Sequence, residues 1–397
     1  MSHITAQDVL KQLQIFRRSL PPPTEGDFDM REELLAESRR FLLSLERDHN
    51  VVHRVCYQVM ETVAISAAMR MGLFAAFKNG PTSIDDIALG CNADPVLVGR
   101  LLRCLTAFGA VEETGTSCYD HSTVSRAFTK KDNEAAMIFC LEFLTPSWLC
   151  LPSYLEENGW RNPESATITA LSKAHVRDGS PKSLFQIMKA GPSRVLEAFN
   201  VYMTNFNDGH KSWTEFYPVM ERLGREAKQD ASAVMMVDVG GGYGHQAAEL
   251  KHKFQQLPGR FVVQDLVQGL PASPKDGIEY MEHDFFAEQP IKGARCYYLR
   301  YIAHDWSQEK NVQICTQICK AMEPGYSRLI INEWIVPESA PSKFMTVQDL
   351  NLMSVQGGME RTLLLHREYL EKAGLKITNI FWPGDTISEA VIEAGVA

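Results

Sequence analysis

The sequence contains no cluster of basic residues. Lys and Arg together number 40, against 49 Asp and Glu, which gives a formal net charge of -9 at pH 7. Proteins that bind nucleic acid through its phosphates need a concentrated positive surface. We therefore expect no nucleic-acid partner.

The sequence also lacks an uninterrupted apolar run long enough to span a bilayer. Its most apolar stretch, 137–155, contains Glu142, Pro146 and Pro152. The N-terminal segment mixes acidic and polar residues with its apolar ones, unlike the apolar core of a secretory signal. We expect a cytoplasmic protein without a membrane partner, in which 137–155 forms buried or pocket-lining helices.

Paired cysteines are missing as well. The nine cysteines are scattered singly, and the two nearest in sequence are Cys315 and Cys319. Structural zinc sites show C-x-x-C pairs or Cys/His clusters, and disulfide scaffolds are short secreted chains. The pattern predicts reduced thiols and no metal site.

The chain does have enough apolar sequence for two or three structural units, since 45% of its 397 residues are hydrophobic and 22% are charged. Pro21, Pro22 and Pro23 are expected to break the first helix. The pattern predicts an N-terminal helical arm, a winged-helix-like dimerisation domain, a helical substrate-pocket segment and a cofactor-binding α/β domain, at residues 1–50, 51–130, 131–225 and 226–397.

Residues 51–130 are typical of a winged helix, with short helices before a strand-turn-strand. Ser83 and Asp94 stand where they can cap the second and third helices. The third helix, PVLVGRLLRCLTAFGA, carries two arginines on a largely apolar surface, which is too few cations for DNA binding. Exposed apolar helix surface indicates a protein partner, so we interpret this unit as the interface of a homodimer.

Residues 131–225 combine helical spacing with many Met and aromatic residues. Such side chains usually form core, but a subset can line an apolar cavity for a flat ligand. Simple packing is the alternative for each of the residues that we expect to line this cavity, which are Phe143, Trp148, Met203, Phe206, Met353 and Met359.

Residues 226–397 alternate strands with helices. The apolar runs VMMVDV, RFVVQD, IEYMEHDF, CYYLRYIA and RLIINEWIV are predicted strands, and QAAELKHKF and QEKNVQICTQICKAM are predicted helices. This alternation predicts a Rossmann-like, mostly parallel sheet that is covered on both faces and binds ligands at the carboxyl ends of its strands.

The first of these strands runs into a glycine-rich turn, Asp238 to Gly244. Gly240 and Gly242 permit backbone conformations and a close ligand approach that a Cβ would prevent. A dinucleotide fingerprint needs a third glycine where this chain has His245, and no G-K-[ST] follows. A pyrophosphate site and a P-loop are both disfavoured.

Acidic residues end the next two strands. Asp265 ends RFVVQD, where its carboxylate can accept hydrogen bonds from both hydroxyls of a ribose. Asp284 ends IEYMEHD and precedes Phe285, so an acid for an adenine amine and a ring for its face arrive together. A nucleoside cofactor without phosphate, on this architecture, indicates S-adenosylmethionine.

The C-terminal half resembles the plant and fungal small-molecule O-methyltransferases of the caffeate and flavonoid type. The matching runs, in the family's order, are VDVGGGYGHQAAEL, VVQDL, EHDFF, YYLRYIAHDW, INEWIVPE and GGMERTLLLHREYLEKAGL. The N-terminal half is similar in VMETVAISAAMRMGLFAAF and SLFQIMKAGPSRVLEAFNVYM. The resemblance implies a class I methyltransferase fold and cofactor contacts at Gly240, Gly242, Asp265, Leu266, Asp284, Phe285 and Arg300, the last in place of the Lys usual in plant members.

The resemblance also implies a general base. His304 follows the run YYLRYIA, and Glu333 and Glu360 match the acids that flank the family's base. An imidazole with its ordinary pKa would take a proton from a phenol at a cost of about 5 kcal/mol, so carboxylates that raise its basicity are needed. On an extended chain Asp305 would point away from His304, which favours a structural or loop-anchoring role for it.

The sequence leaves the acceptor open. We expect methyl transfer to a phenolic or enolic hydroxyl of a small, mostly apolar secondary metabolite. The alternatives are a pericyclase-like enzyme that keeps bound S-adenosylmethionine but catalyses a rearrangement, an N- or C-methyltransferase, and a regulatory protein that acts through its winged helix. His304 favours methyl transfer, because pericyclase-like members alter that position. The expected loop DLNLMSVQGGMERT is shorter than its plant counterpart.

Overall fold

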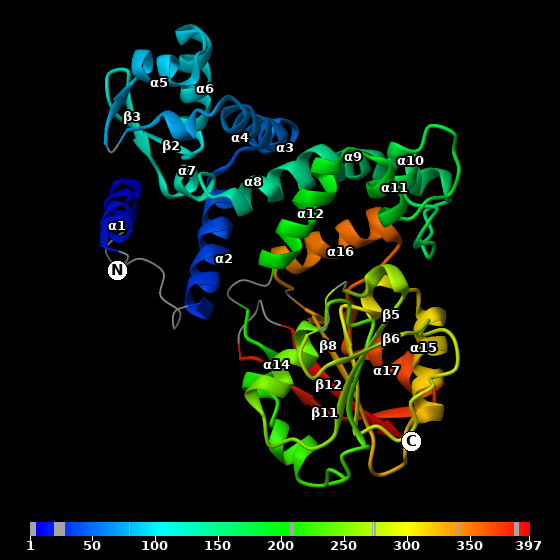
Figure 1. Cartoon of the computed structure of the whole chain (residues 1–397). Helices are drawn as coiled ribbons and strands as arrows, with labels where there is room; N and C mark the ends of the chain where they lie inside the picture. The colour runs from blue at the N-terminus through cyan, green and yellow to red at the C-terminus, as the bar shows by residue number, and fades with distance from the viewer. Residues whose placement is uncertain are drawn as a thin grey trace. The chain divides into compact units, whose positions relative to one another are not determined.

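The computed structural model describes residues 5–19, 28–78, 80–206, 210–271, 273, 275–339, 341–384 and 389–397. The break expected at Pro21, Pro22 and Pro23 lies outside the described residues. The chain divides into two units, Met1–Gln58 and Val59–Ala397. The first unit contains helices α1 (Ala6–Ser19), α2 (Phe28–Leu45) and α3 (Asp48–Tyr57) (Figure 1).

The second unit begins with short helices and a small sheet. Its helices are α4 (Val59–Met71), η1 (Phe74–Ala76), α5 (Ile84–Cys91), α6 (Pro95–Ala107) and α7 (Thr123–Ala127), and its strands β1 (Thr82–Ser83), β2 (Val111–Gly115) and β3 (Cys118–His121) pair in the antiparallel order β1-β3-β2. The Ser83 side chain accepts a hydrogen bond from the Asp86 backbone, and Asp94 accepts from the backbone of Val96 and Leu97. Both predicted caps are confirmed.

A long helical run follows. It consists of α8 (Lys131–Met137), the π-helix η2 (Ile138–Leu144) and α9 (Thr145–Glu157), and by length and composition alone Lys131–Glu157 would suffice to cross a membrane. Its buried residues include Phe139, Phe143 and Leu144. The shorter helices after it are α10 (Ala170–His175), α11 (Leu184–Ala190), α12 (Ser193–Asn205), α13 (Trp213–Phe216) and η3 (Met220–Gly224).

Seven of the described strands form the central sheet, in the order β11-β12-β8-β7-β4-β5-β6. All are parallel except β12, which runs antiparallel between β11 and β8. This confirms the predicted mostly parallel sheet. The strands are β4 (Val234–Val239), β5 (Arg260–Asp265), β6 (Glu279–Glu282), β7 (Cys296–Arg300), β8 (Arg328–Glu333), β11 (Leu375–Phe381) and β12 (Ala390–Val396).

Helices cover both faces of this sheet (Figure 1). On one face α15 (Gln308–Ala321) and α17 (Leu363–Lys372) pack against Val237, Tyr297 and Ile331. On the other face α13, η3 and α14 (His245–Lys253) pack against Met236 and Tyr298. Because successive strand residues point to opposite faces, each buried strand contributes to both clusters.

The structure differs from the sequence-based expectations at two places near the sheet. The strand predicted over CYYLRYIA ends at Arg300, because Tyr301 adopts a left-handed backbone with φ 53° and the short 3-10 helix η5 (Ala303–Asp305) follows. The prediction that DLNLMSVQGGMERT forms a loop is wrong over most of the segment, because α16 covers Lys343–Gln356. Ser342 caps the start of α16, and Gly357 ends it at φ 64°.

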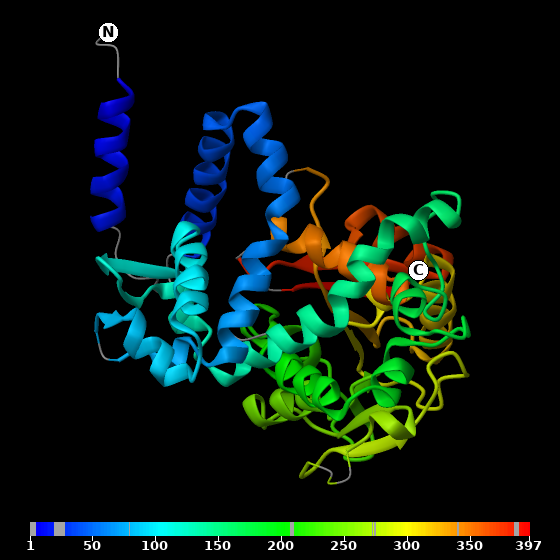
Figure 2. The ribbon, with the colours of Figure 1, turned by 90° about the horizontal axis from the view of Figure 1, so that it is seen from above.

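Helix α16 and the long helical run are neighbours. Helices α9 and α16 lie side by side, as do α10 and α16 (Figures 1 and 2). The remaining short elements of this half are η4 (Val267–Gly269) and the parallel pair β9 (Ile335–Val336) and β10 (Arg361–Thr362). The helical segment therefore meets the sheet domain above the carboxyl ends of its strands.

Candidate active site

The predicted cofactor residues follow the carboxyl ends of four neighbouring parallel strands. Gly240 follows β4, Asp265 ends β5, Asp284 lies two residues beyond β6, and Arg300 ends β7. The sheet order places β4 between β5 and β7, where the connections diverge to the two sides. Such a switch point is where open α/β sheets bind their ligands.

The glycine turn is tightly packed. Gly240 and Gly242 have φ of 74° and 52°, and a Cβ on Gly240 would lie 2.5 Å from the Cδ1 atom of Ile302. The N–H of Gly242 donates to Asp265 Oδ2 at 2.9 Å. A side chain at Gly240 would collide with Ile302, and both glycines adopt the left-handed backbone that favours glycine, so the turn presents backbone to a ligand.

The buried Asp238 beneath this turn has a free acceptor. Its side chain is 2% exposed, and Oδ2 has no hydrogen-bond partner among the described residues. Burial raises the pKa of Asp238 to about 7, although the Ala247 N–H and the Arg300 cation oppose this. A ligand ammonium would supply the missing partner, and the amino-acid end of S-adenosylmethionine carries one.

Arg300 also retains a donor. Its Nη2 atom lies 3.0 Å from Glu389, while its buried Nε has no partner among the described residues. Burial alone would lower the pKa of Arg300, but Tyr298 and Glu389 hold it above the ordinary value. A permanent cation with one free N–H suits the carboxylate of the same cofactor.

The nucleoside end has matching groups. Asp265 Oδ1 accepts from the Leu266 N–H at 2.7 Å, and each carboxylate oxygen keeps a lone pair for a ribose hydroxyl. Asp284 accepts from the Phe286 N–H at 2.9 Å. The Phe285 ring lies beside the glycine turn, because a Cβ on Gly240 would be 3.7 Å from its edge. The residues present therefore fit S-adenosylmethionine.

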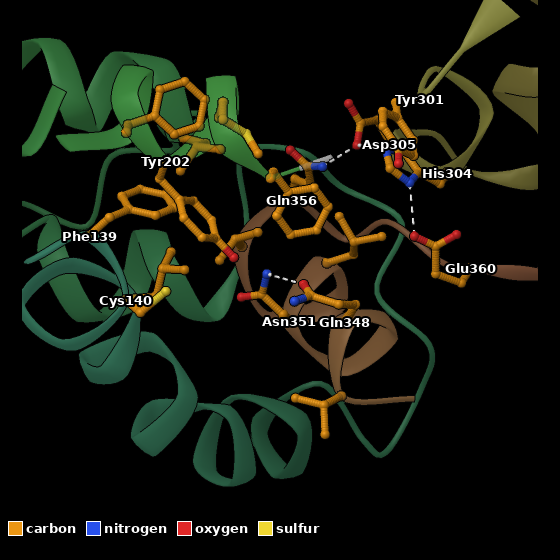
Figure 3. A pocket seen from close by; sticks show the side chains of 18 of the residues that line it. Phe139, Cys140, Tyr202, Tyr301, His304, Asp305, Gln348, Asn351, Gln356 and Glu360 are labelled. Atoms are coloured by element: carbon orange, nitrogen blue, oxygen red, sulfur yellow. Dashed lines mark hydrogen bonds and ion pairs between the residues drawn. The ribbon is translucent and has the colours of Figure 1, made fainter. Parts of the chain in front are cut away.

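His304 lies in η5, directly after the left-handed Tyr301. Its Nδ1 is 2.9 Å from Glu360 Oε1, and its Nε2 is 3.2 Å from Asp305 Oδ1 (Figure 3). The His304 side chain is 13% exposed. Since Nδ1–H donates to Glu360, Nε2 is the ring nitrogen that is left to take a proton from a substrate.

The carboxylates dominate the charge state of His304. Burial alone would lower its pKa, but Glu360, Asp305 and Glu333 raise that pKa to about 10. Burial raises the pKa of Asp305 to about 6, although the neighbouring His304 opposes this. The imidazole is thus a much stronger base than an ordinary histidine.

Glu333 makes its hydrogen bonds to the turn that carries His304, and it acts on the ring only through its charge. Glu333 Oε1 accepts from the backbone N–H groups of Ile302, Ala303 and His304 at 2.9, 2.6 and 3.3 Å. At the other end of the turn the buried Arg361 donates to the carbonyl of Ala303 at 2.6 Å and to that of Trp306. An anion and a cation therefore hold the two ends of η5.

The expectation that Asp305 points away from His304 is wrong. It assumed an extended chain, whereas both residues belong to a 3-10 helix, and the Asp305 carboxylate folds back onto Nε2. Gln356, at the end of α16, donates to the same carboxylate (Figure 3). Asp305 is part of the immediate surroundings of the ring.

A cavity of about 430 Å³ opens in front of His304. One wall is aromatic and comes from the helical segment and Trp334, and the other is the pocket face of α16 (Figure 3). Among the described residues that line it, the charged or titratable groups at the catalytic end are Tyr301, His304, Asp305 and Glu360. The aromatic wall contains Phe139, Phe199, Tyr202, Phe206 and Trp334, and α16 contributes Val347, Gln348, Asn351, Leu352, Val355 and Gln356.

Three of the six predicted pocket residues line this cavity, namely Trp148, Met203 and Phe206. The other three expectations are corrected by the structure. Phe143 is buried between Phe139 and His175, with ring centroids 5.7 and 4.8 Å away. Met353 lies off the lining face of α16, and Met359 instead donates its backbone N–H to the His304 carbonyl at 2.8 Å.

Several residues of the site were not expected from the sequence. Gln348, Asn351 and Gln356 recur at positions that share one helical face, a signal that reading α16 as a helix would have revealed. Tyr301 gave no such signal, because it lies in a run that reads as a continuous strand. Glu389 enters from β12, whose pairing with β8 sets Ala390 opposite Glu333.

Comparisons with known proteins identify the family of the chain. The family model of an O-methyltransferase domain matches residues 201–376, and that of an O-methyltransferase dimerisation domain matches residues 54–131. The demethylsterigmatocystin 6-O-methyltransferase of Aspergillus flavus is 33% identical to this chain, over 87% of the chain and 88% of the relative.

Two solved structures share the whole architecture. One is described as a pericyclic reaction enzyme, with a TM-score of 0.81 and 27% identity over 100% of both chains. The other is OxaC in complex with SAH and oxaline, with a TM-score of 0.78 and 25% identity over 98% of both chains. The chain belongs to the S-adenosylmethionine-dependent O-methyltransferase family. It is an enzyme that uses this cofactor and carries the family's dimerisation domain.

Proposed function

We propose that this enzyme methylates a phenolic or enolic hydroxyl of a flat, uncharged secondary metabolite, with His304 as general base. The observation that carries the proposal is the position of His304, which lies between Glu360 and Asp305 at the end of a largely apolar cavity. When bound, S-adenosylmethionine supplies an electrophilic methyl group on a cationic sulfur. Gly240, Asp265 and Arg300 are the residues proposed to hold it.

The chain's own residues then remove the proton of the acceptor hydroxyl. His304 Nε2 would take the proton of the acceptor hydroxyl, so that the acceptor oxygen could attack the methyl group that the bound cofactor would supply. A base with a pKa of about 10 matches a phenol, whose pKa is also about 10. The transfer itself is then nearly balanced, but His304 is protonated at neutral pH and must release that proton to solvent before it can act as base, so activity is expected to rise with pH. Glu360 fixes the Nδ1–H tautomer, and Glu333 holds the turn.

The cavity indicates what the acceptor is like. Its aromatic wall suits the face of a ring system. The amides of Gln348, Asn351 and Gln356 on α16 suit carbonyl or hydroxyl groups along one edge of that ring system. The described residues that line the cavity include no Lys or Arg that could bind an acidic acceptor.

The test uses labelled S-adenosylmethionine and a panel of aromatic acceptors that carry phenolic or enolic hydroxyls. Wild type is expected to transfer label, and His304→Gln to lose roughly 10²- to 10⁴-fold in kcat, the usual range for a general base. His252→Gln, which changes an exposed histidine of α14, is the matched control. Retention of wild-type kcat in His304→Gln would falsify the proposed base.

A second candidate is a rearrangement catalyst, because one structural neighbour is a pericyclic reaction enzyme. The same incubations distinguish the two. Rearrangement gives a product of unchanged mass with no label, whereas methyl transfer adds label to every product molecule. The NMR spectrum of a labelled product separates transfer to oxygen from transfer to nitrogen or carbon.

We also propose that the enzyme works as a homodimer in the cytoplasm, without a nucleic-acid or membrane partner. The match to a dimerisation domain and the net charge of -9 support this. Analytical ultracentrifugation is expected to show two chains per particle, and a monomer at micromolar concentration would contradict the proposal.

A further inference from the structure

Tyr301 holds a backbone conformation that its side chain disfavours. Its φ of 53° lies in the left-handed region, which carries an energetic cost for a non-glycine residue when the surroundings impose it. Glycine or asparagine would relieve that cost. A tyrosine at this point, between β7 and the turn of His304, indicates that its side chain has a use.

The ring of Tyr301 lies against the proposed base. Its plane is inclined by 11° to the imidazole of His304, with the two centroids 5.3 Å apart (Figure 3). The guanidinium of Arg300 lies 4.8 Å from the centroid of the same ring. One aromatic ring thus contacts both the base and the cation of the cofactor site.

The hydroxyl of Tyr301 donates to the carboxylate of Glu389. Glu389 is 1% exposed, and its oxygen also lies 3.0 Å from Arg300 Nη2 and 3.6 Å from His210 Nδ1. Burial would raise the pKa of Glu389, but His210 and Arg300 hold it below the ordinary value. A buried, charged carboxylate therefore anchors Tyr301 and Arg300 together.

We propose that Tyr301 and Glu389 are positioning residues that couple the cofactor-side cation Arg300 to the base His304. The stacked ring sets the plane of the imidazole, so that Nε2 faces the acceptor, and the hydroxyl fixes the ring. Glu389 fixes Arg300 through the same carboxylate. This inference rests on the proposed role of His304, and it assigns a task to two residues outside the base and its acids.

The test follows the charge state of His304 directly, by NMR of ¹³Cε1-labelled histidine in the full-length protein, with His304→Gln to assign the signal. The charged or titratable groups that face His304 from the elements packed around it are Glu333, Glu360, Arg361 and His366, with Tyr301 and Asp305 from its own segment. Tyr301→Phe removes only the Tyr301 hydroxyl and leaves the other groups in place. A change in the pKa of His304 in this variant therefore reports the loss of the hydrogen bond between Tyr301 and Glu389.

Tyr301→Phe is expected to lower kcat about tenfold, the effect of losing one hydrogen bond to a charged group. It is also expected to lower the pKa of His304, because a loosened ring stabilises the imidazolium less well. The dissociation constant of S-adenosylhomocysteine is expected to stay unchanged. Glu389→Gln is expected to lower kcat and also to weaken the binding of S-adenosylhomocysteine, because it removes the carboxylate that holds Arg300.

Tyr297→Phe is the matched control. It removes a tyrosine hydroxyl of β7 that donates to the carbonyl of Ile291 at 2.7 Å, away from the site. A lower melting temperature with unchanged kcat is expected. Should Tyr301→Phe behave like this control, or like wild type, the positioning role is overturned. The NMR measurement needs no turnover, so a failure of the base proposal would be seen separately, as full activity of His304→Gln.

Discussion

At the scale of single residues, the site depends on which groups reach each nitrogen of His304. Glu360 holds Nδ1, and Asp305 holds Nε2 until an acceptor takes its place. The two contacts differ in permanence, because Glu360 is buried whereas the Asp305 side chain is 35% exposed. Asp305 is therefore the group that can move when an acceptor enters.

Replacing Glu360 is expected to shift the pH dependence of catalysis. Glu360→Gln keeps the shape of the side chain but removes the carboxylate that contributes most to raising the pKa of His304. The rising limb of kcat/KM against pH is expected to move from near pH 10 toward the ordinary histidine value of about 6.5. The maximal kcat is expected to fall about 10²-fold, because the base becomes weaker.

The control for this change is Glu371→Gln, which alters an exposed carboxylate of α17. Its pH profile is expected to match that of wild type. A Glu360→Gln profile that keeps its limb near pH 10 would show that another group controls the observed titration.

Some of this residue-level arrangement could be predicted and some could not. Motif order placed His304, Glu360 and the glycine turn correctly at one edge of the sheet. The contact between Asp305 and His304 depends on a left-handed residue, Tyr301, that ends a strand early. Nothing in the local sequence demands that conformation of a tyrosine.

At the scale of elements, α16 joins the acceptor cavity to the base. Its last turn ends at Gly357 and Gly358, and the chain then binds the His304 backbone through the Met359 N–H at 2.8 Å. A Cβ on Gly358 would lie 2.4 Å from the carbonyl oxygen of His304. The close approach of these two segments therefore requires glycine.

Gly358→Ala is expected to push α16 away from the turn of His304. We expect a loss of about 1–3 kcal/mol in unfolding free energy, typical of overpacking, together with at least a roughly tenfold fall in kcat, because small displacements of catalytic groups are costly. Urea unfolding and steady-state kinetics measure the two effects.

Gly395→Ala is the comparison for this variant, because its new Cβ would meet Thr378 at an ordinary 3.7 Å. It is expected to retain wild-type kcat. Equal kinetic effects of the two substitutions would contradict the proposed contact.

The prediction of a loop in place of the last part of α16 was wrong for a physical reason. Gln348, Asn351 and Gln356 occupy the face of the helix that lines the cavity, where an ordinary amphipathic helix carries apolar residues. The apolar periodicity that marks a helix was thereby broken. Strands such as VMMVDV were predicted correctly, since all six residues of β4 are buried and five of them are apolar, Asp238 being the exception.

At the scale of the whole molecule, the buried site makes stability depend on pH. The folded-state pKa of His304, about 10, lies above its unfolded value of about 6.5. Between these values the folded protein binds more protons than the unfolded chain. The stabilisation is therefore complete below about pH 6.5 and is lost as the pH rises toward 10, by at most about 1.4 kcal/mol per pH unit.

The unfolding free energy of the cofactor-free enzyme is accordingly expected to fall between pH 7 and pH 9, as measured by urea titration at several pH values. Asp238, with a pKa of about 7, adds to the decline only at the lower end of this range. His304→Gln is expected to show a shallower decline. If the unfolding free energy fell equally steeply with pH in wild type and in His304→Gln, His304 would be ruled out as the source of the pH dependence.

The overall architecture was more predictable than the site, because alternating strands and helices constrain a sheet strongly. The C-terminal pair β11 and β12 was not predicted, although it completes that sheet. Antiparallel insertion of β12 is a long-range event, with Ala390 pairing to Glu333 and Ile392 to Ile331. Local patterns carry no information about such a partner.

The position of β12 has a consequence for biosynthesis. The ribosome makes the glycine turn, the base and its acids before it makes β12, yet β12 lies inside the sheet and brings in Glu389. A nascent chain that ends before this strand leaves β8 and β11 with unpaired edges. The enzyme is therefore expected to become active only after β12 has been made and inserted between β8 and β11.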